Sequence, residues 1–167
     1  NGPVGKIVND VPLKEKGVKT VGIVYRGPRL LTANRPIKTP AEVKGLKLRL
    51  PEIKPWMEVW KSLGALPTPV PFQEVYMALK TGVVEAQENP PESIWSLKFY
   101  EAQKYMMRTE HIYSACKYQI SMKWFNTLNK ETQDLIIKAW EDAAKYANEM
   151  AVAADKDYTA KLQKEGG

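Results

Sequence analysis

The chain has 167 residues, of which 44% are hydrophobic and 26% are charged, enough for one domain with a buried core or for one lobe of something larger. Its 25 Lys and Arg residues outnumber 19 Asp and Glu residues, but they are scattered along the chain, whereas nucleic-acid binding would concentrate them on one face. The net charge of +6 therefore suits an anionic small ligand, or it reflects only a soluble surface. No apolar run approaches the roughly 20 residues that span a bilayer, so we expect no direct membrane insertion.

Strand and helix patterns alternate along the first part of the chain. Extended segments are predicted at 18–25, 29–33, 46–50, 66–71 and 83–89, and short helices at 40–44, 53–64, 72–82 and 90–100. The first of these strands is apolar enough to be central in a sheet. Short strands that alternate with short helices form βαβ units. The sequence therefore predicts the α/β class, with a mostly parallel sheet flanked by helices.

The last part of the chain is different. Two further strands are predicted at 104–109 and 111–122, and a long C-terminal helix follows, with Asn129 as its N-cap. A helix from about 130 to 163 is about 50 Å long at 1.5 Å per residue. A compact body of this chain length is only about 32 Å across. The helix is therefore expected to extend beyond its own lobe, to kink, or to cover a partner absent from this chain.

Catalytic and metal chemistry has little support in the sequence. His111 is the only histidine, which excludes metal clusters and triads that need more than one. Cys116 is the only cysteine, so no intrachain disulfide exists, and its odd spacing from His111 places the two side chains on opposite faces of a predicted strand. Phosphate-binding and zinc-protease motifs are absent from the sequence. We therefore predict a protein that is not an enzyme, with no cofactor and no metal.

Arginines offer a better indication of function. Parallel sheets place ligands outside the carboxyl ends of their strands, and Arg49 and Asn89 both stand at such ends. A guanidinium presents two parallel N–H donors that match the oxygens of a carboxylate. Pro51 ends the strand just after Arg49, so we interpret Arg49 as the residue that binds the carboxylate of a ligand. Surface positions are the better interpretation for Arg26 and Arg35.

Other candidates have two interpretations each. Asn89 is either the cap of the following helix or a ligand contact, because Pro90, Pro91 and Glu92 after it form a helix-start pattern. Trp56 and Phe72 either pack in the core or form the wall of a pocket. Glu52 either opposes an anion or bonds a ligand hydroxyl.

Three stretches resemble the solute-binding subunit of tripartite ATP-independent periplasmic (TRAP) transporters, of the dicarboxylate type. They are GPRLLTANRPIKTPAEVKGLKLRLPE, LGALPTPVPFQEVYMALKTGVVEAQENP and KFYEAQKYMMRTEH. The resemblance implies a two-lobed periplasmic binding protein that captures an organic acid, such as a sugar acid, between its lobes. Such a protein delivers its ligand to the permease subunits in the membrane.

The resemblance also implies roles for single residues. The ligand arginine of the family falls in the block matched here by LRLP, hence Arg49. A second pocket arginine falls at Arg29 rather than Arg35, in the block GPRLLTANRP. The pocket asparagine is Asn89 and the pocket aromatic is Phe72. Glu52 follows the arginine block at a place that often faces ligand.

Family members are about twice as long as this chain, in line with two-lobed domain sizes. We therefore expect residues 1–128 to form the second lobe with hinge strands and 129–167 to form a long bracing helix, with the first lobe largely absent. The ends at Asn1 and Gly166-Gly167 are interpreted as cut from a longer precursor that carries a signal peptide. The expected location is the periplasm, or an extracytoplasmic, membrane-tethered position in a Gram-positive source. The alternatives are a sensing module without a transport role and, with less support, an enzyme of carboxylate metabolism.

Overall fold

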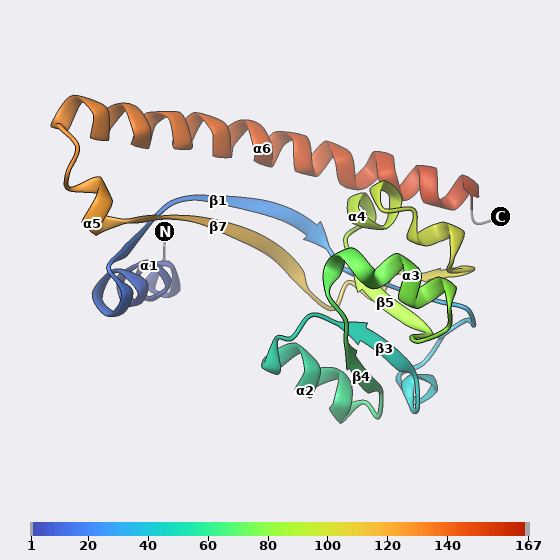
Figure 1. Ribbon diagram of the computed structural model, residues 1–167. Coiled ribbons are helices and arrows are strands. Elements are labelled where there is room, and N and C mark those ends of the chain that lie inside the picture. The colour runs from blue at the N-terminus through green and yellow to red at the C-terminus, as the bar shows by residue number, and fades with distance from the viewer. Residues whose placement is uncertain (1, 166–167) are drawn as a thin grey trace. The chain divides into compact units, whose positions relative to one another are not determined.

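The computed structural model describes residues 2–165, apart from the side chain of Val4, and Figure 1 shows its helices and strands. The chain ends that we interpret as cut, Asn1 and Gly166-Gly167, lie outside the described residues. The chain folds as two compact units. They are the described parts of Asn1–Arg26 with Ser114–Ala153, and of Gly27–Tyr113 with Ala154–Gly167.

The second unit is built on a five-stranded sheet with the strand order β4-β3-β5-β2-β6. Its strands are β2 (Leu30–Ala33), β3 (Lys47–Leu50), β4 (Leu66–Pro69), β5 (Ala86–Asn89) and β6 (Tyr105–Met107). Strand β3 runs parallel to β4 and β5, whereas β2 runs antiparallel to β5 and β6. Every strand but β2 therefore points the same way, and the predicted α/β fold with a mostly parallel sheet is confirmed.

Helices and turns cover both faces of this sheet (Figure 1). They are η1 (Pro40–Val43), α2 (Lys54–Ser62), η2 (Phe72–Glu74), α3 (Val75–Lys80), α4 (Pro91–Ser96) and η3 (Phe99–Glu101). On one face Leu31 and Leu48 belong to a core with Trp60 of α2, and on the other face Leu30 belongs to a core with Val75 of α3. Successive strand residues point to opposite faces, so each strand supplies both cores.

The first unit contains a two-stranded sheet of β1 and β7. Its elements are α1 (Pro3–Lys16), β1 (Val18–Pro28), β7 (Tyr113–Ser121), α5 (Met122–Phe125) and α6 (Lys130–Glu165), and three of them, β1, β7 and α6, contribute residues to both units. The strand at 18–25 exists, but the expectation that it is central in a sheet was wrong, because β7 is its only partner within the described residues. Helix α1 was missed, since Pro12 inside it argues against a helix.

Helix α6 has 36 residues and is therefore about 54 Å long. Its predicted cap is confirmed, because the Asn129 side chain accepts a hydrogen bond from the Thr132 N–H at 2.8 Å. Within the first unit Asn148 fastens α6 to β1: its Oδ1 accepts the Tyr25 N–H at 2.7 Å, and its Nδ2 donates to the Ile23 carbonyl at 3.0 Å. In the described part of the chain, no helix is both long enough and apolar enough to cross a membrane.

Candidate functional site

Three polar side chains lie at the same end of three neighbouring strands in the five-stranded sheet. Arg49 is near the carboxyl end of β3, and Asn89 is the last residue of β5. Arg29 directly precedes β2, and because β2 is antiparallel to β5, its first residue Leu30 pairs with Asn89. The start of β2 therefore lies beside the carboxyl ends of β3 and β5, and the carboxyl ends of the strands are where α/β sheets bind their ligands.

Arg49 is buried, with 3% of its surface exposed. Its Nε and Nη2 both donate to the carbonyl of Val70, at 2.9 and 2.7 Å. The backbone after β4 thus holds one edge of the guanidinium, an interaction that the sequence did not predict. Burial lowers the pKa of Arg49, as does the positive charge of Arg29, while the negative charge of Glu88 raises it.

Part of the Arg49 guanidinium remains available. A guanidinium has five N–H donors, and the Val70 carbonyl occupies only the Nε side. Nη1 of Arg49 has no hydrogen bond to the described residues. Only Asn9, Thr20 and Asp155 among these residues have a side-chain polar atom that lacks both a hydrogen bond and solvent-accessible surface, so Nη1 of Arg49 is accessible to solvent. The far end of the guanidinium can therefore accept a carboxylate end-on, through Nη1 and the second hydrogen of Nη2.

Arg29 has an internal counter-ion, Glu88. Its Nε donates to Glu88 Oε2 at 2.5 Å and its Nη2 to Glu88 Oε1 at 2.9 Å, a bidentate pair. Nη2 also lies 2.8 Å from the Glu88 carbonyl and 2.9 Å from Asn89 Oδ1. The Glu88 side chain has no exposed surface, so this pair is buried. Arg29 is thus held rigidly, and its charge is compensated within the protein.

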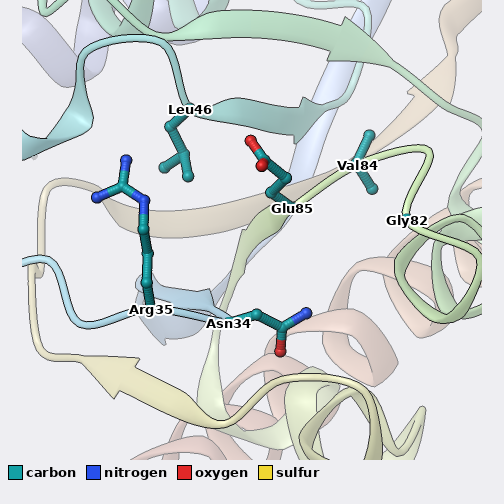
Figure 2. A pocket seen from close by; sticks show the side chains of 6 residues that line it. All are labelled: Asn34, Arg35, Leu46, Gly82, Val84 and Glu85. Carbon is teal, nitrogen blue, oxygen red and sulfur yellow. The ribbon is translucent and has the colours of Figure 1, made fainter.

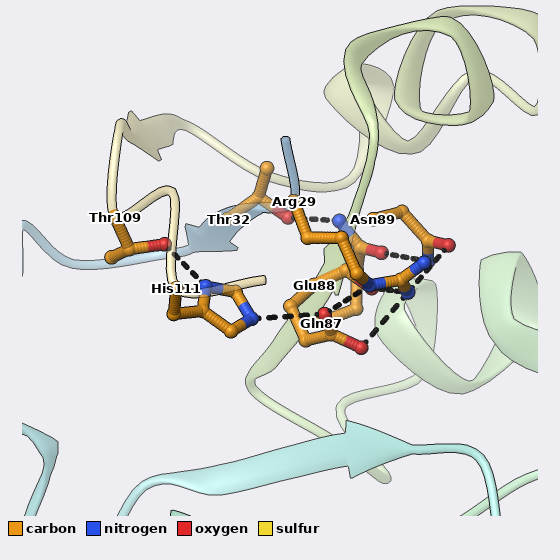
Figure 3. A network of polar contacts seen from close by, with 7 residues as sticks. All are labelled: Arg29, Thr32, Gln87, Glu88, Asn89, Thr109 and His111. Carbon is orange, nitrogen blue, oxygen red and sulfur yellow. Dashed lines mark hydrogen bonds and ion pairs between the residues drawn. The ribbon is translucent and has the colours of Figure 1, made fainter. Parts of the chain in front are cut away.

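Figure 3 shows that the network extends from Glu88 in a second direction. His111 Nε2 lies 3.0 Å from Glu88 Oε2, and His111 Nδ1 lies 2.8 Å from the Thr109 hydroxyl. The His111 ring also meets Trp60 edge-on, with ring centroids 4.9 Å apart. The Glu88 carboxylate therefore has an arginine and a histidine as partners, and both are fixed by further contacts.

Asn89 belongs to a row of buried side-chain amides and hydroxyls. Its Nδ2 donates to Gln87 Oε1 at 2.6 Å, and Gln87 Nε2 donates to the Thr32 hydroxyl at 2.8 Å (Figure 3). The cap of α4 is Pro90, without a side-chain hydrogen bond. The interpretation of Asn89 as a helix cap was therefore wrong: its side chain points back into the sheet and connects Arg29 to Gln87.

Two aromatic side chains accompany the two arginines. The Arg29 guanidinium lies over the Trp56 ring at 4.8 Å, and the Arg49 guanidinium lies over the Phe72 ring at 5.7 Å. Phe72 is 42% exposed, and Trp56 is partly buried. Glu52 is exposed and has no hydrogen bond or ion pair with the described residues. The structure thus gathers five of the six predicted site residues into two cation–aromatic pairs and an amide, while Glu52 makes no hydrogen bond or ion pair with any of them.

Glu88 and His111 were missed as site residues. A signal for Glu88 was present in the run Gln87-Glu88-Asn89, since three consecutive polar residues in a buried strand require partners on both faces. His111 precedes β7, whereas Cys116 lies in it, so the prediction that the two residues share a strand was wrong. Cys116 is exposed and free.

Figure 2 shows a pocket elsewhere in the same unit, about 330 Å³ in volume. Its lining residues are Asn34, Arg35, Leu46, Gly82, Val84 and Glu85. Residues 34 and 35 follow the end of β2, and Leu46 precedes β3, so this pocket lies at the opposite edge of the sheet from Arg29 and Asn89. Arg35 there donates to the Glu42 carbonyl at 2.8 Å and is exposed, as predicted for a surface arginine.

An α/β unit with charged groups at the carboxyl ends of its strands is an architecture that binds ligands in the crevice outside those ends. The family model DctP, bacterial extracellular solute-binding protein family 7, matches residues 1–167, and the chain belongs to this family. The predicted resemblance to TRAP solute-binding subunits is thereby confirmed. The family consists of binding proteins, so the expectation that the chain is not an enzyme is confirmed as well.

Individual relatives are similar over most of this chain. The 2,3-diketo-L-gulonate-binding periplasmic protein YiaO of Escherichia coli is 37% identical over 166 residues, which are 98% of this chain and 50% of that protein. The sialic acid-binding periplasmic protein SiaP of Vibrio cholerae is 40% identical over 135 residues, 81% of this chain and 42% of that protein. A TRAP periplasmic solute-binding protein from Roseobacter denitrificans, crystallised with bound L-galactonate, is 32% identical with a TM-score of 0.92, over 99% of this chain and 55% of that one. The chain therefore spans about half the length of these relatives.

Proposed function

We propose that this chain is the ligand-binding second lobe of an extracytoplasmic receptor that captures an organic acid for a TRAP transporter. The observation that carries the proposal is the state of Arg49, a buried arginine at a strand end with one edge bonded to Val70 and the other open. Such a guanidinium is fixed in place before the ligand arrives, so binding requires little ordering of the side chain.

In this proposal the ligand carboxylate binds end-on to Nη1 and Nη2 of Arg49. The Arg29 side chain contributes hydrogen bonds through its own Nη1, which has no partner among the described residues and is also open to solvent. Phe72 and Trp56 exclude water from the ion pair, which strengthens it because the local dielectric constant falls. The second hydrogen of the Asn89 amide nitrogen and the Glu52 carboxylate are left for hydroxyl groups of the ligand.

A sugar acid is the ligand class that the relatives favour. The similar proteins described above carry names that specify diketogulonate, sialic acid and bound galactonate, each an acid with several oxygen functions. A row of neutral polar side chains beside the arginines, Asn89, Gln87 and Thr32, supplies the hydrogen-bonding groups that hydroxylated ligands need.

The remaining parts of the proposal concern the whole protein. Residues 1–128 form the second lobe with hinge strands, and 129–167 form the bracing helix. The first lobe provides the opposing wall of the pocket, and the membrane permease subunits receive the ligand. The protein acts in the periplasm, or tethered outside the membrane in a Gram-positive source.

The test is isothermal titration calorimetry on the full-length protein with a panel of sugar acids. Arg49→Met retains the apolar bulk of the stem but removes the guanidinium, and Arg35→Met makes the same change at the opposite edge of the sheet. We expect Arg49→Met to weaken binding of the best acid by at least about 30-fold, because truncating one partner of a buried charge pair costs about 2–5 kcal/mol. Arg35→Met leaves the affinity unchanged. Equal affinities for the wild type and the Arg49→Met protein would refute the proposal.

A further inference from the structure

We infer that Pro71 is a positioning residue of the site: it fixes the direction of the Val70 carbonyl, and through that carbonyl it holds the Arg49 guanidinium in place for the ligand. This inference rests on the proposed function and adds to it a residue that contacts no ligand there. It follows from the backbone geometry of the segment after β4 and from the contacts that this segment makes with Arg49.

The segment from Val70 to Phe72 contacts the Arg49 guanidinium in two ways. The Val70 carbonyl accepts hydrogen bonds from Nε and Nη2 of Arg49, at 2.9 and 2.7 Å. The guanidinium also lies over the Phe72 ring, 5.7 Å from its centroid. Pro71 stands between these two residues and is itself exposed. Its position in the chain, rather than a contact of its side chain, therefore connects it to Arg49.

Pro71 restricts both backbone angles that direct the Val70 carbonyl. These angles are ψ of Val70 and φ of Pro71, because each of them rotates the peptide group that carries this carbonyl. The proline ring holds φ near about −65°, and φ of Pro71 is −52°. A proline also restricts the residue before it to an extended conformation, with ψ of about +120° to +160°. Another residue type at position 71 would leave both angles free to vary.

The segment is anchored on both sides of Pro71. The partly buried Val70 side chain packs against the core that contains Phe99, and the Phe72 ring meets Phe99 edge-on, with ring centroids 6.4 Å apart. The Pro71 carbonyl accepts the Glu74 N–H at 3.0 Å, in the first turn after the segment. A carbonyl held in this way fixes the arginine before the ligand arrives, so less side-chain freedom is lost on binding.

Pro69 provides a matched control in the same stretch of chain. It is the last residue of β4, and it restricts the peptide group that carries the Thr68 carbonyl. Among the described residues, the Arg49 side chain donates to the Val70 carbonyl and not to that of Thr68. Replacing either proline by alanine frees the backbone and adds one N–H, and both changes make the unfolded chain more flexible. Only Pro71→Ala frees the carbonyl that holds Arg49.

The first experiment is calorimetry on the full-length protein with galactonate, 2,3-diketogulonate and sialic acid as titrants. We expect Pro71→Ala to weaken binding of the tightest of these acids by about three- to tenfold, because the arginine must then be ordered on binding. Pro71→Gly frees the backbone further and should weaken binding more, whereas Pro69→Ala should retain the wild-type affinity. Equal losses in Pro69→Ala and Pro71→Ala would indicate a general loss of rigidity and overturn the role of Pro71.

The second experiment observes the Nε–H group of Arg49 by nitrogen-edited NMR of the full-length protein without ligand, with the signal assigned by its absence from Arg49→Met. A change in global stability alone does not move this signal. We expect Pro71→Ala to shift it toward the position of a solvent-exposed arginine and to lower its heteronuclear NOE, and Pro69→Ala to leave both unchanged. A mobile, solvent-exposed Arg49 in the wild-type protein would overturn the inference without any variant.

The two experiments separate the inference from the proposed function. A folded Pro71→Ala protein that retains either the wild-type affinity or the wild-type Arg49 signal would overturn the inference. The proposed function would remain intact, provided that Arg49→Met still loses affinity. If none of the three acids binds the wild-type protein, the proposed function fails, and the inference fails with it.

Discussion

The carboxylate of Glu88 and the guanidinium of Arg29 form a bidentate pair across neighbouring strands, with N–O distances of 2.5 and 2.9 Å and no exposed surface on the Glu88 side chain. Glu88 lies in the central strand β5, and Arg29 stands at the start of β2 beside it. The pair fixes one wall of the candidate site, whereas the other arginine, Arg49, donates to a neutral carbonyl, that of Val70.

The buried pair has a predicted effect on stability. Glu88→Ala leaves Arg29 as an uncompensated buried charge, so we expect it to lower the free energy of unfolding by about 3–5 kcal/mol. Urea denaturation followed by circular dichroism measures this change. Asp134→Ala is the control, because its partner Lys130 is 81% exposed and such surface pairs contribute little. Equal losses in the two variants would contradict the importance of the buried pair.

Phe72 offers a test of the aromatic contact with Arg49. Phe72→Leu retains an apolar side chain but removes the ring face over the guanidinium, a contact of about 0.5–1 kcal/mol at a partly exposed site. We expect ligand affinity to fall by about two- to fivefold in calorimetry. Trp124→Leu changes another exposed aromatic residue in the first unit and should have no effect on affinity. A Phe72→Leu protein with wild-type affinity would show that the ring does not support Arg49.

The Tyr76–Glu101 hydrogen bond, 2.8 Å long, predicts a pH effect on stability. It lowers the pKa of Glu101 below 4.5 and raises the pKa of Tyr76 above 10.0. A carboxylate with a lowered pKa stabilises the fold above its unfolded pKa, and that contribution is lost as the pH falls through the folded value. The raised pKa of Tyr76 has the opposite effect on the pH dependence. Its contribution to the stability of the fold is present below pH 10.0 and is lost as the pH rises through the pKa of Tyr76 in the folded state.

Carbon NMR titration of the Glu101 carboxyl group provides the measurement. Tyr76→Phe removes the donor, so we expect the pKa of Glu101 to rise toward its ordinary value. The neighbouring Lys98 at 3.6 Å retains a smaller lowering influence. A pKa of Glu101 that does not move in Tyr76→Phe would contradict the assignment of this hydrogen bond as the main cause.

The cap of α6 is a further point of stability. Asn129→Ala removes the acceptor for the Thr132 N–H, and we expect the free energy of unfolding to fall by about 1 kcal/mol. Asn129→Asp retains an acceptor oxygen and should preserve most of the stability. Thermal denaturation measures the stability of the two variants. Equal stabilities would show that Asn129 merely precedes the helix and does not cap it.

Much of the fold could be predicted from the sequence because local signals and the fold agree. The strand around Leu31 is a short apolar run, as expected for a sheet covered on both faces, and Gly64 and Gly82 follow the helices α2 and α3. The failures arose where the tertiary context overrides the local pattern. Strand β1 is apolar like a central strand, yet its partner is β7, far along the chain, which no local pattern specifies.

The candidate site was only partly predictable. Parallel sheets bind ligands outside the carboxyl ends of their strands, and this rule led to Arg49 and Asn89. It could be applied to the sequence because the βαβ pattern gives the direction of each strand. Partner choice was not predictable, since it depends on which atoms meet in space. The Val70 carbonyl and the Glu88 carboxylate are separated from their arginines by 21 and 59 residues, and sequence spacing contains no information about such contacts.

The most direct measurement is a crystal structure of the full-length protein with the tightest-binding sugar acid. We expect the ligand carboxylate to lie end-on against Arg49, with its oxygens about 2.7–2.9 Å from Nη1 and Nη2, while Nε remains on the Val70 carbonyl. Density that placed the carboxylate away from Arg49, with the guanidinium bonded only to Val70, would contradict the assignment of Arg49 as the residue that binds the acid.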